Sequence, residues 1–250
     1  MKTWSGTVSG SWSSHSPQTL EATLWNAFLA LPGGWEGTLA EVPAAPGRHP
    51  VMIFMHGSSG INEAAKIFGR RLAERGIAFL APNGMATPGR LAYTSPVSPE
   101  IYEKVHAMRS AELDRALEAL PGLSFFDGRF VVAGTSEGGV AAARHAVRPD
   151  LREAGRLILS WSCEDNYHVE QHRTAIPLDM PVLNVMSAED KYFSRANGYL
   201  GNDAALGHAG RTLARHRHAA VVLIPGAPHT LYNEPEAFTH IAAFLERVLA

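Results

Sequence analysis

Short apolar runs alternate with segments of helical periodicity along most of this 250-residue chain, and the alternation restricts its fold more than any other feature. A run such as Val51–Met55 has no polar side chain, which is typical of a strand buried on both faces of a parallel sheet. The pattern predicts an α/β fold, a three-layer sandwich with a mostly parallel central sheet and helices on both faces. The expected strands are residues 37–42, 51–55, 77–81, 129–133, 156–161, 181–186 and 219–224. The expected helices are residues 62–75, 99–120, 137–147, part of 203–217, and 235–249.

The first segment of the chain, residues 1–35, lacks this regularity and is rich in tryptophan. A short helix is expected near residues 19–29, because Pro17 precedes it and a Pro-Gly-Gly turn follows it. Large indole rings are unfavourable in water, so we expect this segment to pack as an N-terminal arm on a main domain of residues 36–250. The tryptophans of the expected arm are Trp4, Trp12, Trp25 and Trp35.

The charge balance and the cysteine content exclude several classes of protein. The 22 basic and 24 acidic residues give a net charge of −2, so neither a nucleic acid nor a membrane surface is an expected partner. Cys163 is the single cysteine and cannot form an internal disulfide. The N-terminus lacks the apolar core of a signal peptide, and no apolar run is long enough to span a membrane. We expect a cytoplasmic protein, and association into a homodimer stays open.

The segment Gly134-Thr135-Ser136-Glu137-Gly138-Gly139 carries the strongest chemical signal in the sequence. It follows an apolar run directly and precedes an alanine-rich segment with helical character. A serine hydroxyl must be exposed, oriented and given a base before it acts as a nucleophile. A sharp strand-to-helix turn would expose Ser136, with Gly134 and Gly138 leaving room for the chain reversal, and the helix N-terminus would favour a developing oxyanion. The pattern predicts a nucleophile elbow at Ser136, with an ordinary glycine-rich turn as the alternative.

From about Trp35 to its C-terminus the chain resembles the α/β-hydrolases, and within them it is most similar to dienelactone-hydrolase-like proteins. The doubled glycine Gly138-Gly139 and the compact length carry the narrower match. Dienelactone hydrolases themselves have a cysteine at the elbow, where this chain has Ser136. The resemblance therefore implies the fold with a minimal cap and the reaction type, but it does not imply specificity for lactones.

The resemblance also implies a triad in the order nucleophile, acid, histidine. The histidine would be His229, in the loop between the last strand and the last helix, and imidazole suits a base that takes and returns a proton. The acid would follow the penultimate strand, which makes Asp190 the first candidate to orient His229. Three other carboxylates remain as alternatives for the acid, namely Glu164, Asp165 and Glu189.

An oxyanion hole of this family combines two backbone N–H groups. One would belong to Glu137, the residue after the nucleophile. The other would come from the turn His56-Gly57-Ser58-Ser59-Gly60, with Ser58 as the first candidate. His56 itself is expected to fix this turn through a side-chain hydrogen bond.

Polar residues on one face of the long helix expected at 99–120 allow two interpretations. Their spacing of three and four residues places them on a common face, which predicts contact with solvent. The alternative is that Arg109 holds a carboxylate of the substrate. The residues of this face are Tyr102, His106, Arg109 and Glu112.

Two aromatic residues, Trp161 and Tyr192, lie near the ends of the strands that would form the site, and they are candidates for an apolar wall around the substrate. The shape of the pocket is expected to depend on residues 84–98 and on residues 163–180, the latter as a small cap.

These observations predict a cofactor-free serine hydrolase that cleaves a small carboxylic ester, lactone or thioester through an acyl-enzyme. No metal is expected, because no complete metal-binding motif surrounds the i,i+4 pair His168 and His172. Two other classes stay open: a serine peptidase of the prolyl-oligopeptidase type, and a non-catalytic binding protein on the same fold. Such a peptidase usually carries a large accessory domain, for which this chain has no room.

Overall fold

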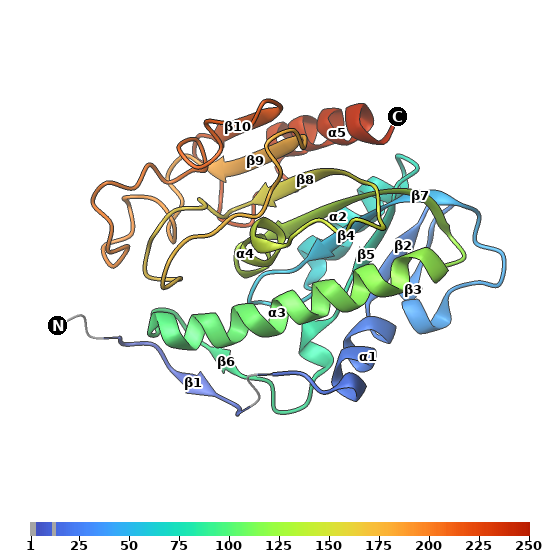
Figure 1. The fold of residues 1–250 in the computed structure, drawn as a ribbon, viewed down its shortest axis with the longest axis horizontal. Coiled ribbons are helices and arrows are strands. Elements are labelled where there is room, and N and C mark those ends of the chain that lie inside the picture. The colour runs from blue at the N-terminus through green and yellow to red at the C-terminus, as the bar shows by residue number, and fades with distance from the viewer. Residues whose placement is uncertain (1–3, 12–13) are drawn as a thin grey trace.

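The computed structural model describes residues 4–11 and 14–250, and in these residues it has one eight-stranded and one two-stranded sheet (Figure 1). The large sheet has the spatial order β3-β2-β5-β4-β7-β8-β9-β10. Neighbouring strands are parallel, except that β2 is antiparallel to both β5 and β3. The strands are β2 (Phe28–Leu31), β3 (Trp35–Thr38), β4 (His49–Met55), β5 (Ala78–Ala81), β7 (Phe126–Thr135), β8 (Glu153–Leu159), β9 (Val182–Ser187) and β10 (Ala219–Ile224).

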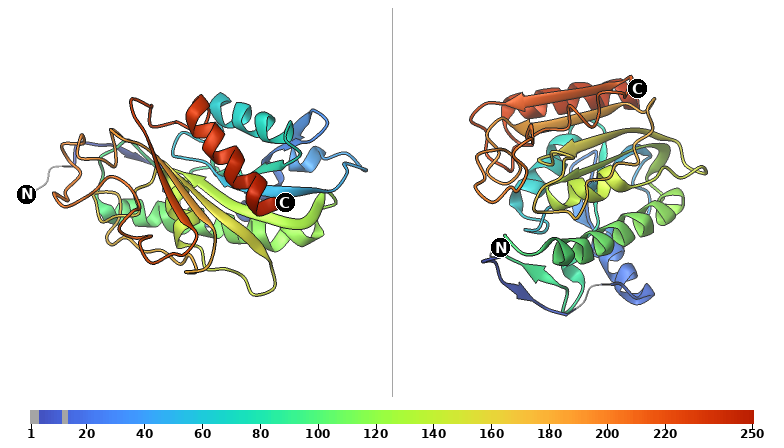
Figure 2. Two further views of the ribbon diagram at one scale, coloured as in Figure 1. Left: turned by 90° about the horizontal axis from the view of Figure 1, so that it is seen from above. Right: turned by 60° about the vertical axis from the view of Figure 1, so that its left-hand side comes forward.

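Helices cover both faces of the large sheet (Figure 2). Helices α2 and α5 pack on one face, and α3 and α4 pack on the other, with α1 beside α3. This arrangement confirms the predicted three-layer α/β sandwich. The helices are α1 (Pro17–Trp25), α2 (Glu63–Ala73), α3 (Pro99–Ala119), α4 (Glu137–Arg144) and α5 (Pro235–Leu249), with short 3-10 turns η1 (Leu39–Glu41), η2 (Gly84–Ala86) and η3 (Leu120–Gly122).

The central strand β4 shows why its sequence is apolar throughout. Val51, Ile53 and Met55 belong to the core on the α3 and α4 face, whereas Met52 and Phe54 belong to the core on the α2 and α5 face. Successive side chains of a strand point to opposite faces, so a strand between two layers of helices must be apolar at every position.

Local signals set the helix boundaries. The Asn62 side chain accepts a hydrogen bond from the N–H of Ala65 at 3.0 Å and caps α2, while α3 and α5 each begin with proline. Helices α2, α3, α4 and α5 confirm four of the expected helices, and each expected strand from residues 51–55 onward has a counterpart within a few residues. In the described part of the chain, no helix has the length and the apolar character needed to cross a membrane.

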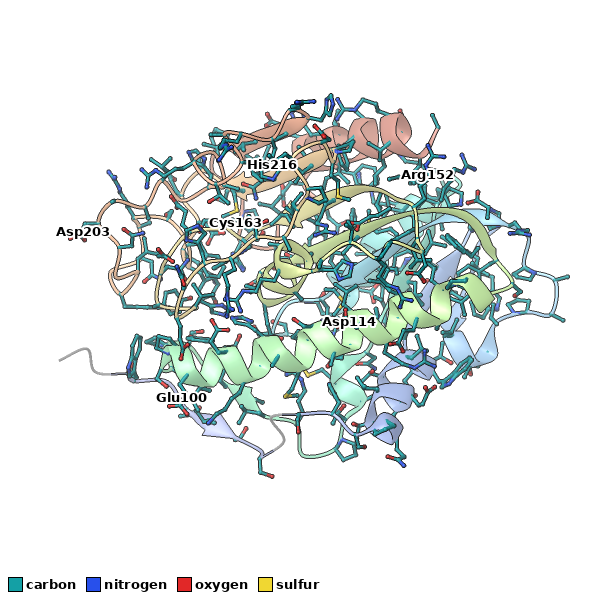
Figure 3. All side chains as sticks on the ribbon, viewed as in Figure 1. Glu100, Asp114, Arg152, Cys163, Asp203 and His216 are labelled. Carbon is teal, nitrogen blue, oxygen red and sulfur yellow. The ribbon has the colours of Figure 1, made fainter. Side chains whose placement is uncertain are left out.

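The helix expected within residues 203–217 is wrong. This stretch, which includes Asp203 and His216, follows an irregular path (Figure 3). The N–H groups of Leu206 and Gly207 donate to the Glu164 carboxylate at 2.9 Å, and Gly207 has a positive φ of 81°. These N–H groups bond to a side chain distant in the sequence, and the stretch keeps only an isolated i to i−4 bond, from the N–H of Leu213 to the carbonyl of Ala209 at 2.8 Å, so no helix forms.

The segment expected to form an arm contributes a strand to the large sheet instead of only packing on it. Its helix ends at Trp25, earlier than expected, and the fully buried β2 follows and pairs with β5. The strand expected at residues 37–42 begins earlier, at Trp35, and gives way to η1 at Leu39. The apolar run of β2 has only four residues and lies within a segment of irregular composition, which obscured it.

The four tryptophans of this segment do not share one environment. Trp4 and Trp35 are partly buried and pack against the core, as expected. Trp25 is 45% exposed, because its indole lies on the outer side of α1 and donates to Glu21 at 2.8 Å. Trp12 lies outside the described residues.

The first described residues pair with a later loop. Strand β1 (Val8–Ser9) is antiparallel to β6 (Ala92–Tyr93), and together they form the two-stranded sheet. The N–H of Gly6 donates to the carbonyl of Pro96 at 2.8 Å, and the N–H of Thr94 donates to the carbonyl of Thr7 at 2.9 Å. The N-terminal segment therefore holds the loop that carries β6.

Gly6→Ala should release this loop, because a Cβ atom at Gly6 would lie 1.9 Å from the carbonyl oxygen of Thr94. Backbone atoms cannot yield to such a contact, so the two strands must separate. We expect faster amide hydrogen exchange at Ala92–Thr94 with little change elsewhere. Gly122→Ala is the matched control, since a Cβ atom there meets nothing within 4 Å. Unchanged exchange in Gly6→Ala would contradict the prediction.

Candidate active site

Ser136 lies at a strained turn between the end of β7 and the start of α4. Its φ is 54° and its ψ is −118°, a backbone conformation that residues other than glycine rarely adopt. A Cβ atom on Gly134 would lie 2.1 Å from the carbonyl oxygen of Gly138, and one on Gly138 would lie 2.0 Å from that of Met55. Only glycine fits at both positions, so the spacing of the motif follows from close backbone contact among β4, β7 and α4.

His229 and Asp190 are brought together from two different loops. The Nδ1 atom of His229 is 2.7 Å from Oδ2 of Asp190. The other carboxylate oxygen accepts the backbone N–H groups of Tyr192 at 2.9 Å and Phe193 at 3.0 Å. Asp190 is 1% exposed, so its position is fixed by hydrogen bonds to both oxygens.

Two serines that sequence reasoning missed anchor the loop of His229. The Ser160 hydroxyl donates to the carbonyl of His229, and the Ser187 hydroxyl donates to the carbonyl of Ala227 at 2.7 Å. Each serine lies at the carboxyl end of a strand, next to the loops of the site. Their position at the carboxyl ends of predicted strands was the one indication in the sequence that these serines belong to the site.

Two of the three alternative acids have other partners. The Glu164 carboxylate accepts backbone N–H groups from Leu206 and Gly207, and Asp165 pairs with His172 at 2.9 Å. Glu189 is exposed. Asp190 is therefore the one of the four candidate carboxylates that has a hydrogen bond to His229 in the structure.

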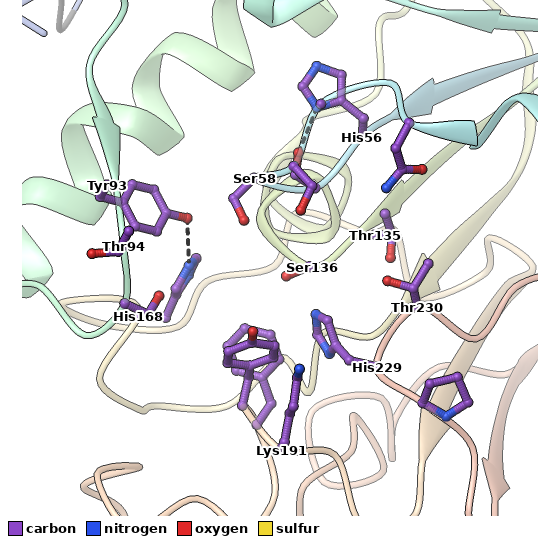
Figure 4. A pocket seen from close by; sticks show the side chains of 18 of the residues that line it. His56, Ser58, Tyr93, Thr94, Thr135, Ser136, His168, Lys191, His229 and Thr230 are labelled. Atoms are coloured by element: carbon purple, nitrogen blue, oxygen red, sulfur yellow. Dashed lines mark hydrogen bonds between the residues drawn. The ribbon is translucent and has the colours of Figure 1, made fainter. Parts of the chain in front are cut away.

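Ser136 and His229 line a common cavity of about 540 Å³ (Figure 4). Its walls include residues from 84–98 and from 163–180, the two segments that were expected to shape the pocket. The turn after β4 and the loop after β9 form other parts of the wall. Tyr192 is one of the lining residues, and its ring packs edge-on against the His229 ring at 4.6 Å between centroids. The two segments contribute Tyr93, Thr94, Ser95, Tyr167 and His168.

The turn after β4 brings Ser58 to this cavity. His56 fixes the turn from its first residue: its Nδ1–H donates to the carbonyl of Gly57 at 2.7 Å, and its Nε2 accepts the N–H of Gly84 at 3.2 Å. Glu137 is the first residue of α4, so its N–H has no acceptor within the helix.

The structure corrects two expectations for the face of α3. Its residues Tyr102, His106, Arg109 and Glu112 are buried, so the prediction of a solvated face is wrong. Arg109 is 0% exposed and does not line the cavity, and therefore it cannot hold a substrate carboxylate there. Trp161 is also absent from the cavity wall, because it is buried and packs edge-on against the Phe193 ring at 4.9 Å.

A cluster of buried ions lies next to the cavity, and sequence reasoning missed it. We call Arg90, Arg109, Glu112 and Glu137 the ion cluster. Arg109 pairs with Glu112, and Arg90 donates to Glu137 at 3.0 Å. Tyr93, which lines the cavity, donates its hydroxyl to Glu137 at 2.8 Å.

The burial of this region changes the titration of its groups. Burial, followed by the Arg109 guanidinium, lowers the pKa of His56 from 6.5 to about 3. Burial also lowers the pKa of His106 and His168. Burial alone would raise the pKa of Glu112, but Arg109 and the hydrogen bond from His15 hold that pKa below its ordinary value. Near neutral pH the lowered pKa values therefore favour the neutral form of these histidines and the ionised form of Glu112.

In the ranges 4–11 and 14–250, no three histidine, cysteine, aspartate or glutamate side chains are grouped so that they could hold a metal ion. His172 pairs with Asp165 at the surface, whereas His168 lies among aromatic rings in the cavity wall, with its ring centroid 4.0 Å from that of Tyr102.

The fold should lose stability in acid because of His56. Unfolded histidine takes up a proton below about pH 6.5, whereas folded His56 does so only near pH 3, so stability falls as the pH decreases through this window. The full contribution is on the order of 5 kcal/mol, with a slope of up to about 1.4 kcal/mol per pH unit.

Urea unfolding between pH 7.5 and pH 5 measures this slope. His56→Gln should be less stable at pH 7.5 but should show a shallower slope, by about 1 kcal/mol per pH unit. His240→Gln, at an exposed position of α5, is the control. Equal slopes for His56→Gln and the wild type would contradict the prediction.

No family model and no curated protein sequence matches the chain, whereas solved structures do. TT1662 from Thermus thermophilus is 19% identical, with a TM-score of 0.60 over 88% of this chain and 92% of that chain. P91, described as a dienelactone hydrolase-like promiscuous phosphotriesterase from metagenomic libraries, is 14% identical, with a TM-score of 0.57 over 100% of both chains. XC6422 from Xanthomonas campestris, described as an α/β serine hydrolase without a lid, is 16% identical, with a TM-score of 0.55 over 88% of both chains. The chain therefore has the fold of the α/β hydrolases and resembles dienelactone-hydrolase-like structures.

Proposed function

We propose that this protein is a serine hydrolase that cleaves a small carboxylic ester, lactone or thioester through an acyl-enzyme. The observation that carries the proposal is the 2.7 Å contact between His229 and Asp190 at the cavity that Ser136 also lines. The names of similar structures, which include esterases and a dienelactone hydrolase-like protein, support a hydrolase. The cavity volume of about 540 Å³ suits a small molecule.

The hydrogen bonds of His229 give it the tautomer that a base requires. An ionised carboxylate only accepts hydrogen bonds, so Nδ1 of His229 donates to Asp190 and Nε2 keeps its lone pair. Nε2 has no hydrogen-bond partner among the described residues. In the proposed mechanism this lone pair accepts the proton of the Ser136 hydroxyl as the serine oxygen attacks the carbonyl carbon.

The tetrahedral oxyanion would accept hydrogen bonds from the backbone N–H groups of Glu137 and Ser58. The N-terminus of α4 would add its positive end. His229 then protonates the leaving group as its bond to the carbonyl carbon breaks, which leaves the acyl group on Ser136. Water then loses a proton to His229 and attacks the acyl carbon. As the bond from this carbon to the Ser136 oxygen breaks, His229 returns the proton to the serine and the acid is released.

Ser136→Ala should abolish labelling by an active-site fluorophosphonate probe and should lower kcat for p-nitrophenyl acetate by about 10⁴-fold or more, because the nucleophile is gone. Ser110→Ala, on α3 and outside the cavity wall, should keep both properties. Labelling that persists in Ser136→Ala would contradict the assignment of the nucleophile.

Asp190→Asn should lower kcat by about 10⁴-fold while the protein stays folded. The amide can donate to Nδ1 of His229, which favours the tautomer with the proton on Nε2, where the base needs a lone pair. Asp165→Asn, at an alternative acid that pairs with His172, should stay within about twofold of the wild-type kcat. If Asp165→Asn showed the larger loss, Asp190 would not be the acid.

A further inference from the structure

The ion cluster lies between the two loops that the proposed function assigns to the oxyanion hole. The side chains of Arg109, Glu112 and Glu137 are 0% exposed, and that of Arg90 is 5% exposed. We propose that Arg109 is a positioning residue, which holds the turn of His56 and Ser58 at a fixed place relative to Glu137 and Ser136. This inference rests on the proposed function and assigns a role that the triad does not include.

Arg109 contacts two atoms of His56, the first residue of the turn after β4. Its Nη2 donates to the carbonyl of His56 at 3.1 Å, and its Nη1 lies 3.1 Å from Nε2 of the same residue. The other ring nitrogen of His56 donates to the carbonyl of Gly57, so the guanidinium fixes two consecutive carbonyl groups, one directly and one through the imidazole. Ser58 follows these two residues, and the direction of its N–H depends on them.

Arg109 also reaches the residue after the nucleophile. Its Nε lies 3.5 Å from Oε1 of Glu137, which is an ion-pair distance without a hydrogen bond, and the same oxygen accepts a hydrogen bond from Arg90 at 3.0 Å. The second oxygen of Glu137 accepts the Tyr93 hydroxyl. Since Glu137 begins α4, these contacts fix the helix N-terminus whose N–H would face the oxyanion.

The position requires a guanidinium rather than any cation. Arg109 directs donors to His56 and to Glu112 at the same time, with a third N–H near Glu137, and a lysine ammonium cannot span these acceptors. Room for the guanidinium depends on Gly84, where a Cβ atom would lie 2.3 Å from Nη1 of Arg109. Two arginines and two glutamates also balance in charge, which a buried cluster needs.

The chain offers a matched control for a buried arginine. Arg156 is likewise 0% exposed, pairs with the glutamate three residues before it, Glu153, and donates to a backbone carbonyl, that of His145. None of these three residues lines the cavity. A general effect of disturbing a buried ion pair should therefore be equal in Arg109→Lys and Arg156→Lys, and a positioning effect should occur only in Arg109→Lys.

The experiment measures kcat and KM for p-nitrophenyl acetate, and the inhibition constant of phenylboronic acid, for the wild type, Arg109→Lys and Arg156→Lys. We expect Arg109→Lys to lower kcat by about 10- to 100-fold and to weaken boronate binding in parallel, with KM within about threefold. Arg156→Lys should leave all three constants within about twofold. A wild-type kcat in Arg109→Lys, or an equal loss in Arg156→Lys, would overturn the inference.

A crystal structure of Arg109→Lys separates this inference from the proposed function. We expect the turn at His56–Ser58 to be displaced relative to Ser136, whether or not the protein turns over esters. An unchanged turn would overturn the role of Arg109, whereas an inactive wild type would overturn only the proposed function.

If Arg109→Lys does not fold, Glu112→Gln replaces it. Removing one acceptor of the guanidinium should lower kcat at least threefold and leave KM nearly unchanged. A wild-type kcat in that variant would equally overturn the inference.

Discussion

Close contact between backbone segments at Gly134 and Gly138 determines where the rest of the site lies. A Cβ atom at Gly138 would collide with the carbonyl of Met55, so the start of α4 touches the end of β4 directly. This contact places Ser136 beside the turn that begins at His56. The strained backbone of Ser136 persists because the surrounding strands and helix hold it on several sides.

The parallel sheet brings the remaining groups to the same place. Strands β4, β7, β9 and β10 run in one direction, and the chain leaves each of them at the same edge of the sheet. The loops after these strands carry Ser58, Ser136, Asp190 and His229 respectively. Ser58, Ser136 and His229 therefore line one cavity although they lie far apart in the sequence, and Asp190 is joined to them through His229. Ligand sites of open α/β sheets commonly lie at this edge of the sheet.

The sequence predicted those parts of the molecule that depend on local patterns. Apolar runs identified the central strands, and the glycine spacing identified the turn at Ser136. It did not predict the path of residues 203–217, because the N–H groups there bond to Glu164, whose position depends on the tertiary fold. The prediction from the sequence also placed Arg109 wrongly, because a polar helix face indicates contact with solvent when no buried partners are known. The partners of Arg109, His56 and Glu137, lie on other elements.

The pairing of β1 with β6 and the contact of His15 with Glu112 have a consequence for the order of folding. Val8, Ser9 and His15 are synthesised about 80 to 100 residues before their partners Tyr93, Ala92 and Glu112, which is several seconds at usual rates of synthesis. Contacts of such long sequence separation form slowly. These partners precede strands β7 to β10 in the chain, so every group of the two contacts has been synthesised before the large sheet can be completed. Once formed, the contacts hold the loop that brings Tyr93 to the cavity wall and cover one side of Glu112 in the ion cluster.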